Sequence, residues 1–227
     1  MSSTGEQIGL FGQPETPAPI GRIPEDASVP ILPETYSTLE DLATDCGVCR
    51  RCELCQGRTN IVVSRGNPTA DIAIIGEAPG QHEDEQGKPF VGRSGQLLDK
   101  ILASVRLDSD RDVYICNIIK CRPPGNRTPA APEVAACKPY LLEQLRLVDP
   151  KIVLFTGATA LKGVTGEKRG ITKIRGQWLD WEGRLAMAIF HPAYLLRNPS
   201  KAKGSPKWLM WQDIQAVRTK LDELHGA

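Results

Sequence analysis

Long hydrophobic runs are missing from this chain of 227 residues. A membrane-spanning helix needs roughly 18 or more consecutive apolar residues, and no stretch approaches that length. The N-terminus also lacks a basic segment followed by an apolar one, so the sequence carries no recognisable secretory signal. Both absences favour a cytoplasmic protein that makes no membrane contact. Histidine and phenylalanine are scarce, with three and four copies, so each copy in a polar loop is a candidate for a specific role.

Cysteine, in contrast, is well represented, with seven residues. Thiols stay reduced in the cytoplasm, so these cysteines point to metal binding or redox chemistry rather than to a disulfide framework. Hydrophobic residues make up 41% and charged residues 24% of the chain, which is ordinary for a globular protein. The chain is therefore long enough and apolar enough to bury a substantial core.

The first 36 residues differ in composition from the rest. They hold six of the 18 prolines and a net charge of −4, which leaves +5 for residues 37–227. Residues 1–36 show no hydrophobic period, so we interpret them as a disordered acidic tail. The folded domain is expected to begin at Ser37, which can cap a helix and has Glu40 at the capping-box position. A mildly basic domain would suit a polyanionic ligand.

Apolar strands alternate with amphipathic helices along the domain. Strands are expected at 70–76, 112–119, 151–157 and 184–190, and helices at 94–105, 132–148 (kinked at Pro139) and 206–224. This alternation predicts an α/β fold of three layers, with a central, mainly parallel four-stranded sheet between helices. Ligand sites in such sheets lie beyond the carboxyl ends of the strands. The loops 76–92, 117–129 and 191–201 are therefore the expected location of the site.

Four cysteines lie three residues apart in the stretch CGVCRRCELC, which runs from Cys46 to Cys55. Every neighbouring pair has the spacing of a chelating pair, so the spacing alone does not choose among them. Cys121 follows in a loop and Cys137 in the next helix, so one site of four thiolates would join these parts of the chain. Cys116 lies in an apolar strand and is interpreted as a core residue. Zinc and an iron–sulfur cluster both suit four thiolates, and unrelated buried thiols are the alternative.

Several longer motifs follow in order, namely RTNIVVSRGNP, GEAPGQHEDEQGKPFVGRSGQLLD, NIIKCRPPGNRTP, AAC and HPAYLLRNP. Together with the preceding CxxC pair they resemble the family-four uracil-DNA glycosylases, which contain an iron–sulfur cluster. The resemblance extends from about Cys49 to the C-terminus, and residues 1–45 lie outside it. It implies the uracil-DNA glycosylase fold and a hydrolase that flips uracil out of DNA and cleaves its N-glycosidic bond, which initiates base excision repair.

The resemblance implies a [4Fe–4S] cluster held by Cys49, Cys52, Cys121 and Cys137. In this assignment Cys49 lies nine residues before the arginine of RTN, Arg58. Cys46 and Cys55 are then spare, although a shift of register would bring either of them into the ligand set. The cluster is expected to be structural and to tie together loops that face DNA, because hydrolysis of the base needs no redox step.

The first of the three loops is implied to bind uracil and water. Gly76, Glu77 and Ala78 belong to its motif GEAPG. Ala78 stands where other glycosylase families place a water-activating Asp. Glu77 and Glu83 are therefore the candidate carboxylates for placing the water or stabilising the cationic sugar. The neighbouring Asp84 is expected to be a solvated surface residue.

Three further side chains complete the expected base pocket. Phe90 is implied to stack on the flipped base. The Asn117 amide can donate to one uracil carbonyl and accept from the ring N–H, a pattern opposite to that of cytosine. A neutral His191 can donate to uracil O2 as negative charge builds there. Core packing, a turn and helix capping are the respective alternatives, while His82 and His225 are interpreted as surface residues.

Residues of the other two loops are candidates for DNA contact, and they are Arg122, Arg127, Leu195, Leu196 and Arg197. The arginines are expected to bind phosphates. The two leucines are expected to be exposed and to fill the gap left by the flipped base. The ligand would be single- or double-stranded DNA that contains uracil, and the protein is expected to be a monomer.

The tail contains the segment QIGLF, in which Gln7, Leu10 and Phe11 resemble the anchors of bacterial sliding-clamp ligands. A disordered segment with an apolar anchor commonly folds on a partner. A sliding clamp is therefore a candidate partner, and chance is the alternative for so short a match.

Two other functions are open at this point. A non-catalytic iron–sulfur or zinc module that binds nucleic acid would keep the scaffold, but it would not need Glu77, Asn117 and His191 at strand ends. A related glycosylase with a shifted base preference would be expected to carry a basic insert with a histidine after the second strand. The segment RPPGNRTP is uninterrupted, which disfavours this variant.

Overall fold

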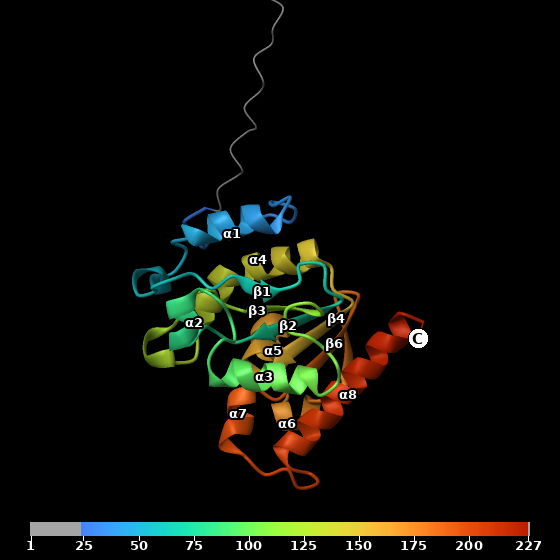
Figure 1. Ribbon diagram of the computed structural model, residues 1–227. Coiled ribbons are helices and arrows are strands. Elements are labelled where there is room, and N and C mark those ends of the chain that lie inside the picture. The colour runs from blue at the N-terminus through green and yellow to red at the C-terminus, as the bar shows by residue number, and fades with distance from the viewer. Residues whose placement is uncertain (1–23, 227) are drawn as a thin grey trace, which may run out of the picture.

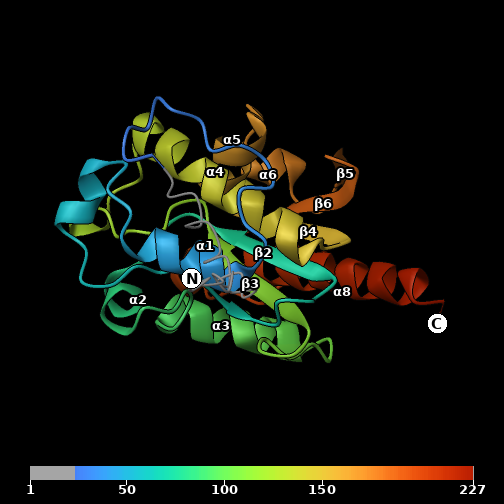
Figure 2. The same ribbon diagram turned by 90° about the horizontal axis from the view of Figure 1, so that it is seen from above.

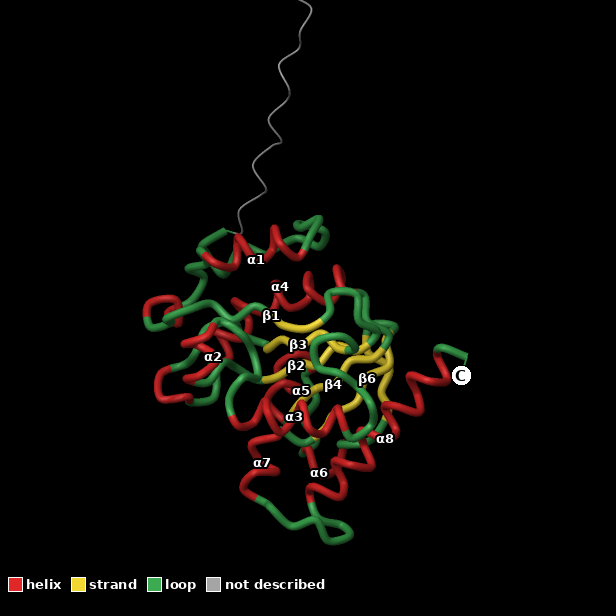
Figure 3. Tube along the Cα trace, viewed as in Figure 1, coloured by secondary structure: helices red, strands yellow, loops and turns green. Residues whose placement is uncertain are grey.

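The computed structural model describes residues 24–226, and the candidate clamp-binding residues Gln7, Leu10 and Phe11 lie outside them. Six strands form one sheet in the order β1-β3-β2-β4-β6-β5 (Figures 1 and 3). They are β1 (Ser64–Gly66), β2 (Ile72–Gly76), β3 (Val113–Asn117), β4 (Ile152–Thr156), β5 (Trp178–Trp181) and β6 (Arg184–Ile189). The central strands β3, β2, β4 and β6 are parallel, whereas β1 and β5 join the two edges in the antiparallel direction.

The predicted α/β class is confirmed, but the predicted number of strands is wrong. Strands β2, β3 and β4 are buried along their whole length, because helices cover both faces of the sheet, and such strands are continuous apolar runs in the sequence. Strand β1 consists of Ser, Arg and Gly and is half-buried, so no hydrophobic pattern indicates it. Strand β5 is similarly half-buried at the opposite edge. The four-stranded sheet is therefore corrected to a mixed sheet of six strands.

Helices cover both faces of the sheet. They are α1 (Leu39–Gly47), α2 (Gln81–Gln86), α3 (Arg93–Ala103), α4 (Ala131–Val148), α5 (Ala158–Thr165), α6 (Ile171–Ile174), α7 (Pro192–Arg197) and α8 (Pro206–Leu224), with short 3-10 turns η1 (Glu53–Gln56) and η2 (Pro124–Asn126). Figure 1 shows α4 on one side of the sheet and α3, α7 and α8 on the other. Viewed from above in Figure 2, α1 lies beside α4, against which it packs. None of the helices described is long and apolar enough to cross a membrane.

Two apolar layers hold these helices to the sheet. On one face, Leu141 of α4 and Leu161 of α5 pack with Phe155 of β4. On the other face, Leu98 of α3 and Ile214 of α8 belong to a second buried cluster. Burial of each large aliphatic or aromatic side chain contributes about 1.5–3 kcal/mol, so the layers fix the strand ends on which the site is built.

The N-cap of α1 differs from the sequence prediction. The side chain that caps α1 is Thr38, whose hydroxyl accepts from the Asp41 amide at 3.1 Å, and not Ser37. The two hydroxyl residues are adjacent, so the sequence placed the cap one residue early. Helix α4 continues through Pro139 as one element of 18 residues.

The segment 24–36 packs against the domain, although the sequence assigned it to a disordered tail. The buried Arg51 guanidinium donates to the main-chain oxygens of Pro24, Asp26, Ala27, Val29 and Ala136 at 2.7–3.2 Å. Tyr36 is buried, and its amide donates to the Glu143 carboxylate. The contacts depend on side chains far along the chain, which local composition does not reveal. Arg51 and Glu143 thus hold parts of this segment against the domain.

Candidate active site and cysteine cavity

Three loops that were predicted to carry the site meet at the carboxyl edge of the sheet. Gly76 at the end of β2 pairs with Asn117 at the end of β3, and His191 follows β6. The pocket between them is lined by Glu77, Ala78, Pro79, Gly80, Gln81, His82, Glu83, Phe90, Gly92, Arg93, Ser94, Asn117, Pro123, Asn126, Arg127, His191, Ala193 and Arg197. The parallel arrangement of the strands thus brings together residues that are more than 100 positions apart.

Phe90 is held in an uncommon backbone conformation at the base of this pocket. Its φ of 54° lies in the left-handed region, a conformation that costs on the order of 1–3 kcal/mol and persists only where the surroundings hold it. Gly95 permits the arrangement, because a Cβ there would lie 1.8 Å from the Phe90 oxygen. The Phe90 ring stacks on the His191 ring with centroids 5.9 Å apart and an interplanar angle of 28°. Phe90 therefore presents an aromatic surface beside His191.

Asn117 is buried, with 2% of its surface exposed, yet its side chain lines the pocket. Gly76 makes room for it, because a Cβ at Gly76 would lie 2.3 Å from Asn117 Oδ1 and 2.6 Å from the Phe90 ring. Asn117 and Phe90, which are both predicted to bind the substrate, therefore lie against the same glycine. An amide in this position can both donate and accept a hydrogen bond.

His191 has a defined protonation state. It is the N-cap of α7, and its Nδ1 accepts from the Ala193 amide at 3.1 Å. Burial, and secondarily the positive charge of Arg197, lower the pKa of His191 to about 4. The imidazole is therefore neutral near pH 7. With Nδ1 acting as an acceptor, its single proton resides on Nε2, which is free to act as a donor.

The two acidic residues at the start of α2 have structural contacts. The Glu83 carboxylate accepts from the amides of Gly80, Val91 and Gly92 at 2.8–3.1 Å. It thereby ties the loop after β2 to the loop that carries Phe90. Asp84 is buried and accepts from the Thr59 amide at 2.9 Å, so the prediction that Asp84 is a solvated surface residue is wrong. The amide that donates to it lies 25 residues away, and local charge density gave no sign of that contact.

Glu77 differs from Glu83 in its surroundings. It lines the pocket and is half-buried. Among the side-chain hydrogen bonds formed within residues 24–226, none involves the Glu77 carboxylate, whereas the oxygens of Glu83 are engaged by main-chain amides. Glu77 therefore has more acceptor capacity left for a water molecule than Glu83.

The predicted DNA-contact residues fall into different environments. Arg197 lines the pocket. Arg127 also lines it and forms an ion pair with Glu133 at 2.6 Å, while Arg122 donates to Asn126 at 2.6 Å.

The leucine pair in α7 is divided between core and surface. Leu196 is 37% exposed, but Leu195 is only 1% exposed and packs in the core below α7. The expectation of two exposed leucines is therefore corrected to one, because consecutive residues of a helix point in different directions.

Some pocket residues were not singled out from the sequence, and they include Gln81, Arg93, Ser94 and Asn126. Arg93 and Ser94 form the first turn of α3, directly after the motif that contains Phe90. A helix N-terminus carries partial positive charge and free amides, and the segment GRSG at the expected start of a helix was the available signal.

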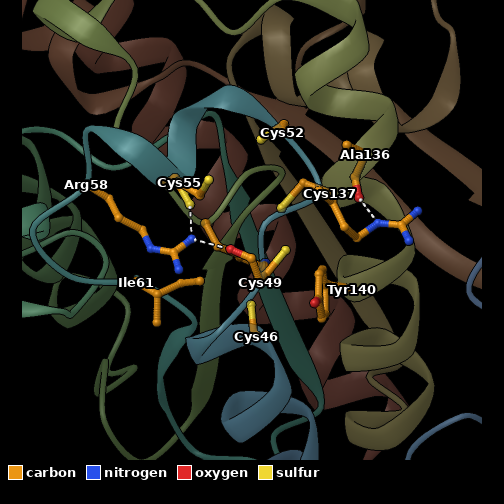
Figure 4. A pocket seen from close by; sticks show the side chains of 12 residues that line it. Cys46, Cys49, Cys52, Cys55, Arg58, Ile61, Ala136, Cys137 and Tyr140 are labelled. Carbon is orange, nitrogen blue, oxygen red and sulfur yellow. Dashed lines mark hydrogen bonds between the residues drawn. The ribbon is translucent and has the colours of Figure 1, made fainter. Parts of the chain in front are cut away.

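A second cavity lies beside the first and is lined by six of the seven cysteines. They are Cys46 from α1, Cys49 and Cys52 from the following loop, Cys55 from η1, Cys121 from the loop after β3 and Cys137 from α4. Figure 4 shows Cys46, Cys49, Cys55 and Cys137 around the cavity. The predicted ligands therefore lie together, but so do the two spare cysteines. Cys116 is buried in β3 outside this lining, as predicted for a core residue.

Arg58 and Tyr140 supply polar groups at the edge of this cavity. The Arg58 guanidinium donates to the Cys49 oxygen at 2.9 Å and to the Cys121 Sγ at 3.3 Å. The buried Tyr140 hydroxyl has no hydrogen-bond partner within residues 24–226. Burial raises the pKa of the Cys137 thiol to about 12, against the effect of nearby Lys120. A group that binds these sulfurs must therefore displace protons, and the free hydroxyl can donate to it.

A zinc ion and an iron–sulfur cluster require different distances between the cysteine sulfurs. Within residues 24–226, no three Cys, His, Asp or Glu side chains come close enough together to bind one metal ion. A zinc ion with thiolates at about 2.3 Å brings all four sulfurs within about 4 Å of one another. In a four-iron cluster each thiolate binds its own iron, so the sulfurs lie further apart. The six cysteines that line the cavity supply more than the four thiolates that an iron–sulfur cluster needs.

The fold and the pocket define a class of α/β protein with a polar site at the carboxyl ends of parallel strands, and the comparisons with known proteins identify the family. The family described as the uracil DNA glycosylase superfamily matches residues 63–215. The chain therefore belongs to this superfamily, as its motifs predicted.

Relatives with high identity narrow the assignment. The Type-4 uracil-DNA glycosylase of Thermotoga maritima is 49% identical over 173 residues, which cover 75% of this chain and 88% of the relative. The Type-4 uracil-DNA glycosylase of Sulfurisphaera tokodaii is 38% identical over 190 residues, 80% of this chain and 84% of the relative. That of Archaeoglobus fulgidus is 39% identical over 170 residues, 71% and 85%. Within the superfamily, this chain is thus one of the type-4 proteins.

Proposed function

We propose that this chain is a uracil-DNA glycosylase, a hydrolase that breaks the bond between uracil and deoxyribose and so begins base excision repair. The observation that carries the proposal is the convergence of Phe90, Asn117 and His191 on one pocket, in a chain of the type-4 family. The Type-4 relatives carry this activity in their names. A module that only binds nucleic acid would not need a neutral imidazole and a buried amide beside an aromatic ring.

Recognition of the base begins when the nucleotide leaves the DNA helix, because the glycosidic bond is not accessible within the stack. The Phe90 ring then stacks on the flipped uracil. The Asn117 amide donates to uracil O4 and accepts from N3–H. Cytosine presents a donor and an acceptor in the reverse order, so the buried amide would be left with unsatisfied groups, and this mismatch disfavours cytosine.

Cleavage moves charge in a direction that suits the pocket. As the bond between C1′ and N1 breaks, the bonding electrons leave with uracil, and the sugar becomes cationic. The Nε2–H of His191 donates to uracil O2, where the negative charge develops. Glu77 holds the water whose oxygen adds to C1′ and accepts its proton. Glu83 keeps the two loops together through its three amide contacts.

The DNA backbone would lie along the rim of the pocket. Arg197 and Arg122 are the proposed phosphate contacts, and Arg127 joins them while its ion pair with Glu133 fixes its position. Leu196 is the proposed wedge that occupies the space of the flipped base. These contacts do not depend on the base sequence, so binding to DNA without uracil should weaken steeply as salt is raised.

A [4Fe–4S] cluster held by Cys49, Cys52, Cys121 and Cys137 is proposed for the second cavity. Bound there, it supplies cross-links between segments and takes no part in hydrolysis. Cys49→Ala should lose the visible iron–sulfur absorbance and most of the iron, which is expected at about four per chain. Cys46→Ala and Cys55→Ala are the matched controls. If Cys46→Ala loses the cluster and Cys49→Ala keeps it, the register of the ligands is wrong.

We propose that the protein acts as a cytoplasmic monomer. A bacterial sliding clamp is the proposed partner of its residues Gln7, Leu10 and Phe11. The proposal rests on the sequence of the tail. A clamp pull-down should retain the full-length chain and lose the Leu10→Ala, Phe11→Ala double variant. Equal retention of both proteins would exclude this contact.

Excision from an oligonucleotide with a single uracil tests the enzymatic proposal. The strand should become alkali-labile at uracil and stay intact in a cytosine control. His191→Ala should lower the single-turnover rate about 100-fold or more, the usual cost of losing a donor to a developing oxyanion. His225→Ala is the matched control, because His225 contacts Asp71 outside the pocket. Absence of cleavage by folded protein that still binds DNA would favour the binding-module alternative.

A further inference from the structure

A fully buried lysine lies between the two cavities. Lys120 has 0% of its surface exposed and stands between the end of β3 and Cys121. Its carbonyl accepts from the Val62 amide at 2.9 Å, which fixes the main chain. Its Nζ donates to the main-chain oxygen of Asn117 at 2.7 Å. The side chain therefore reaches back from the cysteine loop to the residue that lines the base pocket.

The positive charge of this lysine lacks an obvious partner. An ammonium group has three donors, and within residues 24–226 the carbonyl of Asn117 is the acceptor found for Lys120. None of the ion pairs formed in that part of the chain includes Lys120. Burying an unpaired charge is costly, and a counter-charge on another side of the ammonium group would offset that cost.

The cysteine cavity is where that counter-charge belongs. Lys120 lines it together with Cys121 and Cys137. Four thiolates carry more negative charge than the iron–sulfur core carries positive charge, so the complete site is anionic. A cluster in this cavity would therefore supply the charge that the buried ammonium group requires, while the Asn117 carbonyl takes one of its hydrogens.

We propose that Lys120 is a positioning residue that couples the iron–sulfur site to the recognition of uracil. Its ammonium group is held by the anionic cluster on one side and fixes the Asn117 carbonyl on the other. The peptide that carries the uracil-reading amide is thereby locked against Gly76. The inference rests on the proposed cluster and the proposed role of Asn117, and it gives the cluster a purpose beyond holding loops together.

Lys120→Met tests this proposal, because it removes the charge and the donors while keeping an unbranched side chain only one atom shorter. Lys138→Met is the matched control, since Lys138 likewise donates its Nζ to a carbonyl, that of Val164, at 2.7 Å. We would measure iron per chain, the midpoint potential of the cluster and single-turnover excision for both variants and the wild type. The Lys120 variant should have a lower midpoint potential, because a nearby positive charge is lost, and roughly tenfold or slower excision. The Lys138 variant should match the wild type.

The outcomes separate the parts of the proposal. Wild-type protein without iron would refute the proposed cluster, whereas an unchanged potential and excision rate in an iron-loaded Lys120→Met protein would refute the coupling alone. If that variant does not fold, the wild type provides a second test. Coupling is reciprocal, so saturating free uracil should shift the midpoint potential of the wild-type cluster. No shift on uracil binding would overturn the proposal.

Discussion

Gly76→Ala offers a direct steric test of the base pocket. A Cβ at this position would lie 2.3 Å from Asn117 Oδ1 and 2.6 Å from two carbon atoms of the Phe90 ring. These distances are far shorter than the roughly 3.5–4.0 Å of favourable carbon contacts. The backbone at Gly76 is ordinary strand, so alanine introduces no conformational strain of its own. The methyl group must therefore displace one or both of the side chains proposed to bind uracil.

The size of the effect follows from the interactions at stake. Overpacking of this kind costs about 1–3 kcal/mol of stability. Displacing the Asn117 amide removes two hydrogen bonds to uracil, each with a net value of about 0.5–1.5 kcal/mol. The combined loss of about 1–3 kcal/mol in the transition state corresponds to a roughly 5- to 150-fold slower excision.

The assay is single-turnover excision from a uracil oligonucleotide, with thermal unfolding and binding to uracil-free DNA measured in parallel. Gly170→Ala is the matched control, because a Cβ at Gly170 meets no atom within 4 Å. Gly76→Ala should excise slowly, remain folded and bind uracil-free DNA as well as the wild type. Excision at the wild-type rate by a folded Gly76→Ala protein would refute the proposed positions of Asn117 and Phe90.

The protonation of His191 and the packing of the N-terminal segment give two further predictions. Because the pKa of His191 is lowered to about 4, protonation of His191 should not reduce the excision rate until the pH falls to about 5. An inflection of the pH–rate profile near pH 6.5 would contradict this. The unfolded chain takes up that proton at about pH 6.5, so the free energy of unfolding should decrease as the pH is lowered from about 6.5 to 4. His191→Asn should make the free energy of unfolding less dependent on pH in this range. Arg51→Ala should lower the free energy of unfolding by about 2–4 kcal/mol in urea titrations, because five hydrogen bonds to carbonyls are lost. Arg50 is exposed, so Arg50→Ala should leave the free energy of unfolding unchanged. Equal losses in the two variants would contradict the proposed role of Arg51.

The parallel core of the fold was accessible from the sequence, whereas its edges were not. Strands such as β2 are buried on both faces and therefore appear as uninterrupted apolar runs. The edge strand β1 has no apolar residue, and its pairing with β3 depends on main-chain hydrogen bonds that any side chain permits. The packing of residues 24–36 was hidden for a related reason, since it depends on Arg51 rather than on the composition of the segment itself.

The meeting of Asn117 and His191 in one pocket was predictable, because both lie at the carboxyl ends of parallel strands. It was less predictable where a polar residue serves the structure. Asp84 looked like part of a solvated acidic run, yet it accepts main-chain hydrogen bonds from a distant loop. No hydrophobic or charge pattern marks Lys120 as buried in the sequence. Its burial becomes visible only when β3 and the cysteine loop are assembled.

The most direct test of the account compares Asn117→Asp with the wild type on matched oligonucleotides that contain one uracil or one cytosine. A carboxylate can accept from the cytosine amino group but cannot donate to uracil O4. The account predicts that Asn117→Asp excises uracil much more slowly than the wild type and gains measurable excision of cytosine. Retention of the wild-type rate on uracil, with no cleavage at cytosine, would contradict the claim that Asn117 reads the base.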